Sequence, residues 1–203
     1  MRLWTMQSED AYRLLETTGV LHTDKSQILD DSFIPAYDWL AAEMKKRIGE
    51  PPSGVAYPLW AWYQWEGNRK RRDLRCSGYA ERGTPLVQLT IEIPDDAVVL
   101  SDFDDWHYVL NFWYYAMTEQ ESNAFEAEYE AEGFRFLDLG DPEVTDNRIE
   151  KYRKRVRESW QHIFDLWKES EYSSYPIEKK SIQATFWELR REQVLKAEHF
   201  IAK

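Results

Sequence analysis

The run Pro58–Trp65 (Pro-Leu-Trp-Ala-Trp-Tyr-Gln-Trp) constrains the fold of this chain more than any other segment. Its eight residues include three tryptophans and a tyrosine. Aromatic side chains favour strands, and a proline so near the start of the run argues against a helix. We therefore predict a strand over Tyr57–Trp65.

Residues 69–75 follow directly and read Arg-Lys-Arg-Arg-Asp-Leu-Arg, five cations in a chain of net charge −11. Indole faces stack on planar rings and guanidinium groups, and arginines form bidentate hydrogen bonds with phosphate oxygens. A ligand with a flat ring and a phosphate would suit a pocket formed by Trp60, Trp62 and Arg75. We expect Arg75 to face inward, because apolar residues flank it. The alternative is that the tryptophans are core and the arginines form a solvated turn.

The composition limits the class of protein. At 203 residues, with 43% hydrophobic and 15% aromatic content, the chain can bury a sizeable core. The net charge of −11 disfavours extended nucleic acid, which is bound through phosphate neutralisation. No apolar run is long enough to cross a membrane, and the opening residues do not resemble a signal peptide. We expect a cytoplasmic protein without a metal, because its single cysteine, Cys76, rules out a Cys-rich zinc site.

Hydrophobic periodicity predicts one α+β domain over residues 1–203, with a small mixed or antiparallel sheet and several packed helices. The expected strands cover residues 3–6, 20–22, 57–65, 86–93, 98–101 and 181–189. The expected helices cover residues 9–18, 34–48, 119–132 and 147–169, together with one that begins after Asp102. We expect Trp113 and Trp167 to face inward, and the acidic helix 119–132 to be largely solvated.

The segment Ser101–His107 concentrates three carboxylates and an imidazole. Asp104 and His107 are spaced to share a helix face, but no second histidine lies near enough in the sequence to complete a metal site. One interpretation is an acidic first helical turn, which the helix dipole favours. The other is a polar pocket that uses Asp102 and His107 to bind a ligand.

Gln183 is a polar residue in a strand that otherwise has a half-buried pattern. Alternation puts Gln183, Thr185 and Trp187 on one face and Glu188 on the other. Either that face is simply exposed, or Gln183 contributes to a site.

The chain resembles an uncharacterised bacterial family, a domain of unknown function, over almost its full length. The motifs that carry this resemblance are Arg2-Leu3-Trp4-Thr5-Met6-Gln7, Pro58-Leu59-Trp60-Ala61-Trp62, Asp73-Leu74-Arg75 and Ser101-Asp102-Phe103-Asp104-Asp105-Trp106-His107. The family implies no activity.

A weaker resemblance is to ADP-ribosyltransferase-like folds, whose sheet is split. It rests on an opening strand with an aromatic and a polar residue, then a helix, then Gly19-Val20-Leu21. This resemblance implies NAD as cofactor. It also implies catalytic roles for Thr5, Gln183 and Glu188, of which Gln183 replaces the usual carboxylate.

The same resemblance implies ligand contacts from the aromatic and basic residues near those positions. The nicotinamide ring would stack on a tryptophan, and an arginine would hold the pyrophosphate. The expected ligand-binding residues are Arg2, Trp4, Trp60, Trp62, Arg75, Asp102 and His107.

Two other classes of function stay open at this point. One is a non-catalytic module that binds a nucleotide or a protein partner, with the acidic helix 119–132 as the partner surface. The other is a hydrolase with paired acids among Asp102, Asp104 and Glu188, whose separation would decide the case.

Overall fold

The structure is a computed structural model that describes residues 1–203 except 24, 26–29 and 173–174. The chain divides into two compact units, one formed by residues 1–100 with 181–203 and the other by residues 101–180. Each unit is described by itself. One domain over residues 1–203 stays a prediction.

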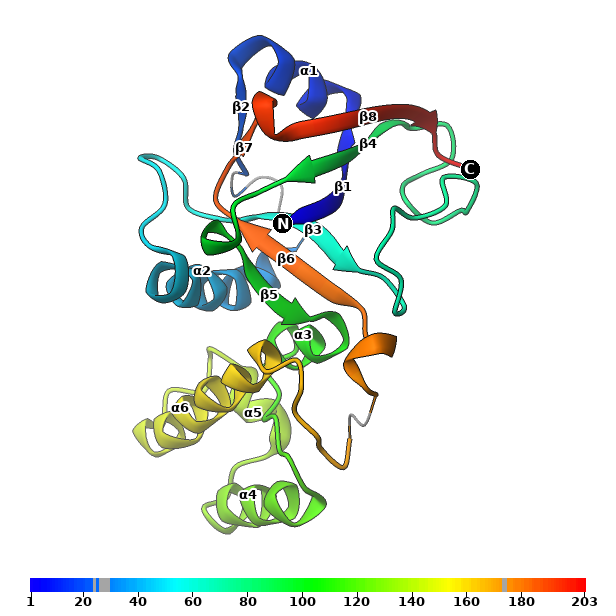
Figure 1. The fold of residues 1–203 in the computed structure, drawn as a ribbon. Coiled ribbons are helices and arrows are strands. Elements are labelled where there is room, and N and C mark those ends of the chain that lie inside the picture. Colours follow the sequence, from blue (N-terminus) through cyan, green and yellow to red (C-terminus); the bar gives the residue numbers. More distant parts are fainter. Residues whose placement is uncertain (24, 26–29, 173–174) are drawn as a thin grey trace. The chain divides into compact units, whose positions relative to one another are not determined.

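A six-stranded sheet in the order β5-β6-β3-β1-β4-β8 organises the first unit (Figure 1). The pairings β1–β3, β1–β4, β3–β6 and β4–β8 are all antiparallel, which confirms the predicted α+β class. The strands are β1 (Arg2–Ser8), β3 (Leu59–Gln64), β4 (Pro85–Glu92), β5 (Val99–Asp102), β6 (Ile182–Phe186) and β8 (Val194–Ile201), with β2 (Val20–Leu21) and β7 (Leu189–Arg190) in a small second sheet.

The two faces of the large sheet differ in character. Leu3, Leu89 and Ala184 belong to the apolar core on one face, together with Leu15 of helix α1 (Glu9–Thr18). The Ser8 side chain caps α1, and the helix ends at Gly19, which adopts a left-handed conformation with φ 83°. Because side chains alternate along a strand, Trp4, Trp60 and Trp62 point to the opposite face. There Tyr37 of helix α2 (Ile34–Ile48) contacts Trp60 edge-on.

The second unit is helical. It consists of α3 (Phe103–Leu110), α4 (Glu119–Ala131), α5 (Phe136–Gly140) and α6 (Glu150–Ser159). Helix α4 is largely exposed, as predicted for residues 119–132. Although it is acidic, it buries Phe125 and Tyr129, and both rings pack edge-on against Tyr152 of α6.

The predicted long helix over 147–169 was wrong. Helix α6 ends at Ser159, and a 3-10 helix then covers Trp160–Phe164. The Ser159 hydroxyl donates to the Val156 carbonyl and accepts a hydrogen bond from the backbone N–H of Tyr115. The Asp165 carboxylate next accepts the N–H of Trp167 and turns the chain. Trp167 is therefore 74% exposed, whereas the neighbouring Lys168 is buried.

The inward orientation predicted for Trp113 was also wrong. It was expected to face inward from a helix, but α3 ends at Leu110 and the backbone of Phe112 turns to φ 56°. Trp113 therefore lies beyond the helix and is 41% exposed.

Two buried ion pairs hold the second unit together. Lys168 donates to Asp105, and Lys180 lies 3.0 Å from Asp102; all four side chains are 2% exposed. Burial raises the pKa of the Asp105 carboxyl, and the nearby Asp102 carboxylate raises it further. The hydrogen bond from Lys168 lowers this pKa, but by less than the other two influences raise it.

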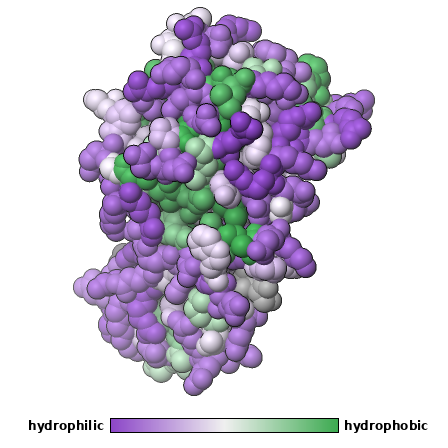
Figure 2. All heavy atoms as spheres, in the orientation of Figure 1, coloured by the Kyte–Doolittle hydropathy of each residue, from purple (hydrophilic) through white to green (hydrophobic). Residues whose placement is uncertain are grey.

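This unit carries most of the net negative charge of the chain. Residues 101–180 contain 19 acidic and 10 basic residues, so they account for nine of the eleven net negative charges. On the face drawn in Figure 2 this unit is mainly hydrophilic. Within the described part of the chain, no helix has the length and apolar character that a membrane crossing requires.

Candidate functional site

A tight hairpin brings the basic segment back towards the aromatic strand β3. Trp65 and Asn68 exchange both backbone hydrogen bonds across a two-residue loop, at 3.1 and 2.8 Å. The loop residues Glu66 and Gly67 have φ values of 46° and 75°. Positive φ at both central positions is the signature of a type I′ turn, which matches the twist of paired strands. This turn is why residues 69–75 lie beside the tryptophans.

The conformation of this turn predicts that two substitutions of Gly67 differ in their effect on stability. A β-branched residue is strained at φ 75°, whereas asparagine tolerates this region. We expect Gly67→Val to lower the free energy of unfolding by about 1–2 kcal/mol, and Gly67→Asn by less than half of that. Urea denaturation of the two variants measures the difference. Equal losses would show that the turn does not require a left-handed residue.

Two arginines of the basic segment lie on aromatic rings. The Arg69 guanidinium sits 3.5 Å from the centre of the Tyr63 ring and 5.5 Å from that of Trp4. It also donates to the Tyr63 carbonyl, which ties it to the sheet.

Arg72 is held differently, between two rings. Its guanidinium lies 3.9 Å from the Trp65 ring and 4.7 Å from the Tyr79 ring, while Trp65 itself contacts Trp62 edge-on at 4.5 Å. Arg72 makes no ion pair with a described residue. Its N–H donors lie in the guanidinium plane, so stacking leaves them able to bind an anion.

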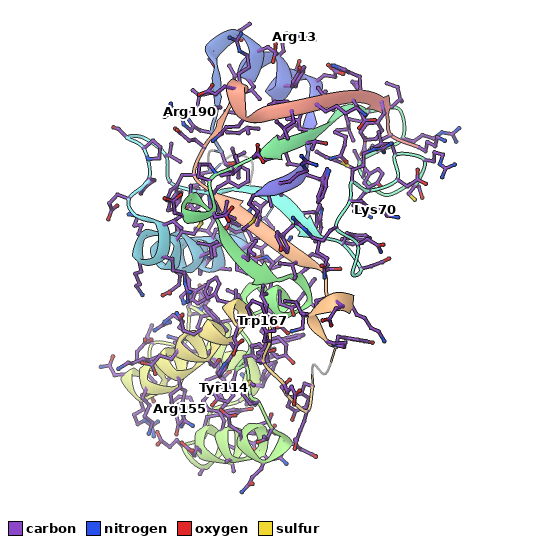
Figure 3. All side chains as sticks on the ribbon, viewed as in Figure 1. Arg13, Lys70, Tyr114, Arg155, Trp167 and Arg190 are labelled. Atoms are coloured by element: carbon purple, nitrogen blue, oxygen red, sulfur yellow. The ribbon has the colours of Figure 1, made fainter. Side chains whose placement is uncertain are left out.

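Two adjoining hollows open beside these residues. The smaller, of about 210 Å³, has aromatic walls from Trp65 and Tyr79. The larger, of about 440 Å³, is lined by the basic segment 70–75, and both hollows share residues 70–73. Figure 3 shows Lys70 on the loop that follows β3. We call Trp62, Trp65, Lys70, Arg72 and Tyr79 the hairpin surface.

The inward orientation predicted for Arg75 was wrong. Its side chain is 84% exposed and forms a bidentate pair with Asp73, two residues earlier, with N···O distances of 2.6 to 3.1 Å. Hydrogen bonds from Arg75 hold the pKa of the Asp73 carboxyl well below its ordinary value. Arg75 lines the larger hollow, but Trp60 and Trp62 line neither hollow, so the pocket does not have the walls that the sequence suggested.

The sheet register settles how the other predicted residues lie relative to one another. Gln183 is paired with Trp62, and Trp62 with Trp4, so these three side chains form one row across β6, β3 and β1. The oxygen Oε1 of Gln183 is buried and accepts no hydrogen bond from a described residue. Thr5 points to the other face, opposite Leu89 of the core, and donates to the Trp60 carbonyl at 2.7 Å.

Arg2 and Glu188 lie outside the hairpin surface. The Arg2 side chain is exposed, and its carbonyl accepts a bond from Arg69. Glu188 accepts bonds from His22 and Arg190, at 3.2 and 2.7 Å. Burial alone would raise the pKa of Glu188, but these two donors hold it below its ordinary value.

In the second unit, Asp102 and His107 have structural contacts. Asp102 accepts the N–H groups of Asp104 and Asp105 at the start of α3, in addition to its pairing with Lys180. His107 is exposed, and its Nδ1 lies 3.2 Å from the carbonyl oxygens of Phe103 and Asp104. No group of three or more potential metal ligands is found in the described parts of the chain.

Trp65 and Tyr79 are the residues of the site that the sequence interpretation missed. The signal for Trp65 was present, because Glu66-Gly67-Asn68 after an alternating aromatic strand is typical of a hairpin. For Tyr79, 14 residues from Trp65, no local pattern indicated the contact with Arg72.

These features define an α+β protein with an aromatic row and a stacked arginine on one face of its sheet. The chain belongs to the family described as Domain of unknown function (DUF3841), whose model matches residues 2–195. Comparison with the curated proteins and with the solved structures gives no significant match.

Proposed function

We propose that the hairpin surface binds a small phosphorylated ligand with a planar ring, a nucleotide or a close relative such as NAD. The observation that carries the proposal is Arg72, stacked between Trp65 and Tyr79 and without an ion pair to a described residue. A guanidinium held in this way is oriented before the ligand arrives, so little side-chain entropy is lost on binding.

The two hollows suggest how such a ligand would divide its contacts. The phosphates would occupy the larger hollow, near Lys70, Arg72 and Arg75. The ring would lie in the smaller one, beside Arg72 and the two aromatic rings that flank it, and the volume of about 210 Å³ suits one heterocycle. A single phosphate group fits this local cluster of cations better than a long polyanion, because the chain as a whole is acidic. We propose that the protein acts in the cytoplasm, as expected from its sequence.

Isothermal titration calorimetry tests the proposal with ATP, ADP-ribose and NAD, and with adenosine as the ligand that lacks phosphate. We expect the three phosphorylated ligands to bind more tightly than adenosine, with affinities that fall as salt is added. Arg72→Gln should weaken binding about 10- to 100-fold, the range for hydrogen bonds to charged groups. Trp65→Ala should remove about 1–3 kcal/mol, by analogy with stacked bases.

The matched control is Arg82→Gln. Arg82 is an exposed cation of the same loop that lines neither hollow. If Arg82→Gln weakens binding as much as Arg72→Gln does, the attraction is non-specific. If no phosphorylated ligand gives heat at millimolar concentration, the nucleotide proposal fails. Binding of a protein partner through α4 would then be the leading proposal.

ADP-ribosyl transfer is a narrower version of the same proposal, and one observation favours it. Gln183 lies beside Trp62 in the row across the sheet, with its Oε1 unoccupied by any described donor. An amide at this place could bind a ribose hydroxyl as nicotinamide leaves. Release of nicotinamide from NAD by the wild type, abolished in Gln183→Ala, would support it. Binding of NAD without cleavage would leave only the binding function.

A further inference from the structure

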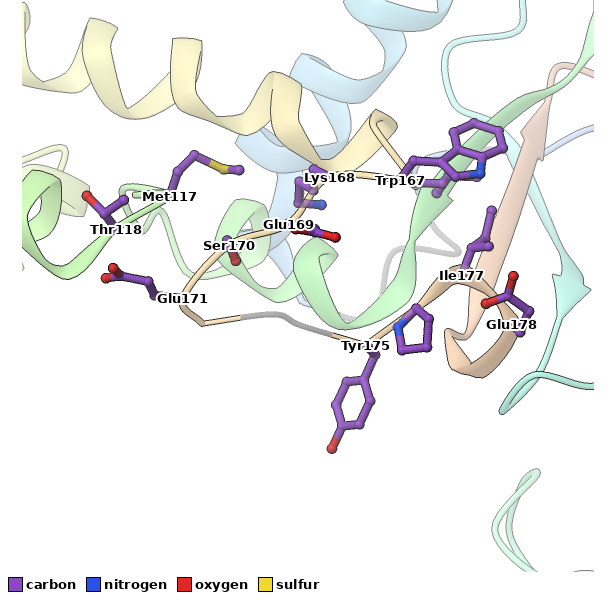
Figure 4. Close-up of a pocket in the computed structure, with 12 residues that line it drawn as sticks. Met117, Thr118, Trp167, Lys168, Glu169, Ser170, Glu171, Tyr175, Ile177 and Glu178 are labelled. Atoms are coloured by element: carbon purple, nitrogen blue, oxygen red, sulfur yellow. The ribbon is translucent and has the colours of Figure 1, made fainter.

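The second unit contains a cavity that the proposed function does not use. Its volume is about 760 Å³, within the range of small-molecule sites. Figure 4 shows Met117 and Thr118 on one side of it, and Trp167, Ile177 and Glu178 on the other.

Trp167 is the most unusual part of this lining. Trp167 is 74% exposed, although its neighbour Lys168 is buried. An indole exposed at the wall of a cavity offers its π-face, which binds cations better than the ring of any other aromatic side chain does.

The charged groups of the cavity are acidic. Glu169, Glu171 and Glu178 line it, and among the described residues of the lining the only cation is Lys168. Because Lys168 is 2% exposed and paired with Asp105, its charge is compensated within the protein. Glu171 accepts the N–H of Glu119, whereas Glu169 and Glu178 form no ion pair with a described residue.

We propose that this cavity binds a small aliphatic polyamine. Its ammonium groups would contact the Trp167 ring and the carboxylates of Glu169 and Glu178, while its methylene stem would lie along Met117 and Ile177. The charge of the unit favours such a cation, because residues 101–180 hold nine of the eleven net negative charges of the chain. The proposal is independent of the nucleotide site.

Calorimetry with spermidine tests the proposal, and 1,5-pentanediol serves as a neutral probe with a similar stem. We expect heat with spermidine and none with the diol. Trp167→Ala should weaken spermidine binding about 2- to 30-fold, the range for cation–π contacts. The double variant Glu169→Gln with Glu178→Gln should weaken it by a similar factor. All three side chains are exposed, so the variants should fold, which far-UV circular dichroism checks.

Matched controls separate this site from general attraction to an acidic surface. Trp113→Ala and Glu130→Gln change an exposed indole and an exposed carboxylate of the same unit outside the cavity, and should leave the affinity unchanged. Arg72→Gln should also leave it unchanged. The proposal is overturned if spermidine gives no heat, if Glu130→Gln weakens binding as much as the double variant does, or if Trp167→Ala has no effect. Tighter binding of a lysine-rich peptide than of spermidine would overturn the small-ligand assignment.

Discussion

Replacing Lys168 with methionine is expected to lower the free energy of unfolding by about 3–5 kcal/mol, because it leaves Asp105 charged and buried without its cationic partner. Both side chains are 2% exposed, so water cannot compensate the carboxylate. Urea denaturation at pH 7, followed by circular dichroism, measures the loss. The double variant Lys168→Met with Asp105→Asn should recover most of it, because no uncompensated charge remains.

The pH dependence of the Lys168→Met variant provides a second readout. Burial already raises the pKa of Asp105 in the folded protein, and loss of the Lys168 bond removes an influence that lowers it. A carboxyl with a raised folded pKa contributes stability below its ordinary pKa, and that contribution is lost as the pH rises through the raised value. The variant should therefore regain stability as the pH falls from 7 towards 5.

The control for this prediction is an exposed cation on helix α6. Lys154 is 72% exposed and lies 3.6 Å from Glu158, so Lys154→Met should cost less than about 1 kcal/mol. A loss in Lys168→Met no larger than this would contradict the buried pair.

The second large effect is expected at Asp102, which the sequence suggested as a ligand contact. In Asp102→Ala the cap of α3 is lost and the buried Lys180 ammonium loses the carboxylate that lies 3.0 Å from it. We expect the free energy of unfolding to fall by about 3–5 kcal/mol for the ion pair, with about 1 kcal/mol more for the cap.

Asp102→Asn separates these two contributions. The amide oxygen can still accept the N–H groups of Asp104 and Asp105, so the cap survives while the charge is lost. Its stability should lie about 1 kcal/mol above that of Asp102→Ala in the same urea experiment. The folded Asn variant should bind ADP-ribose as the wild type does. Weaker binding would show that Asp102 contacts the ligand after all.

The elements that the sequence predicts correctly are those with a local pattern. Helix α2 begins and ends at Ile34 and Ile48 as predicted, since its apolar spacing and the following Gly49 are both local signals. Strand β4 is similar, as the alternation in the second half of the predicted strand 86–93 is a local signal. The pairing of Gln183 with Trp62 shows that the strands predicted over 57–65 and 181–189 are neighbours in the sheet.

The errors arise where tertiary contacts decide. The helix expected to reach residue 169 stops at Ser159, because bonds from distant residues and the Asp165 turn favour a buried Lys168 over a buried Trp167. Arg75 is exposed because Asp73, only two residues away, satisfies its guanidinium locally. The partners of Asp102 and Asp105 are far along the chain, so no sequence pattern could reveal these pairs.

The opposite orientations of two candidate site residues, Trp4 and Thr5, could be predicted from the sequence. Trp4 and Thr5 are adjacent in a strand, so they must point to opposite faces. A ligand stacked on Trp4 could therefore not meet the Thr5 hydroxyl, which lies against the core. The pair Glu66-Gly67 is a second local signal, because it predicts a tight hairpin turn after the aromatic strand. Such a turn brings the arginines that follow it back beside Trp65.

Nuclear magnetic resonance of the indole N–H groups tests ligand binding at the hairpin surface most directly, because each of the ten tryptophans gives its own signal. ADP-ribose is titrated into the ¹⁵N-tryptophan-labelled protein, and the signals are assigned by single Trp→Phe variants. We predict shifts for Trp65 and Trp62 that are lost in Arg72→Gln, with no shift for Trp160, which is buried in the second unit. The absence of any shift at millimolar ADP-ribose, or shifts confined to tryptophans of residues 101–180, would contradict the proposed site.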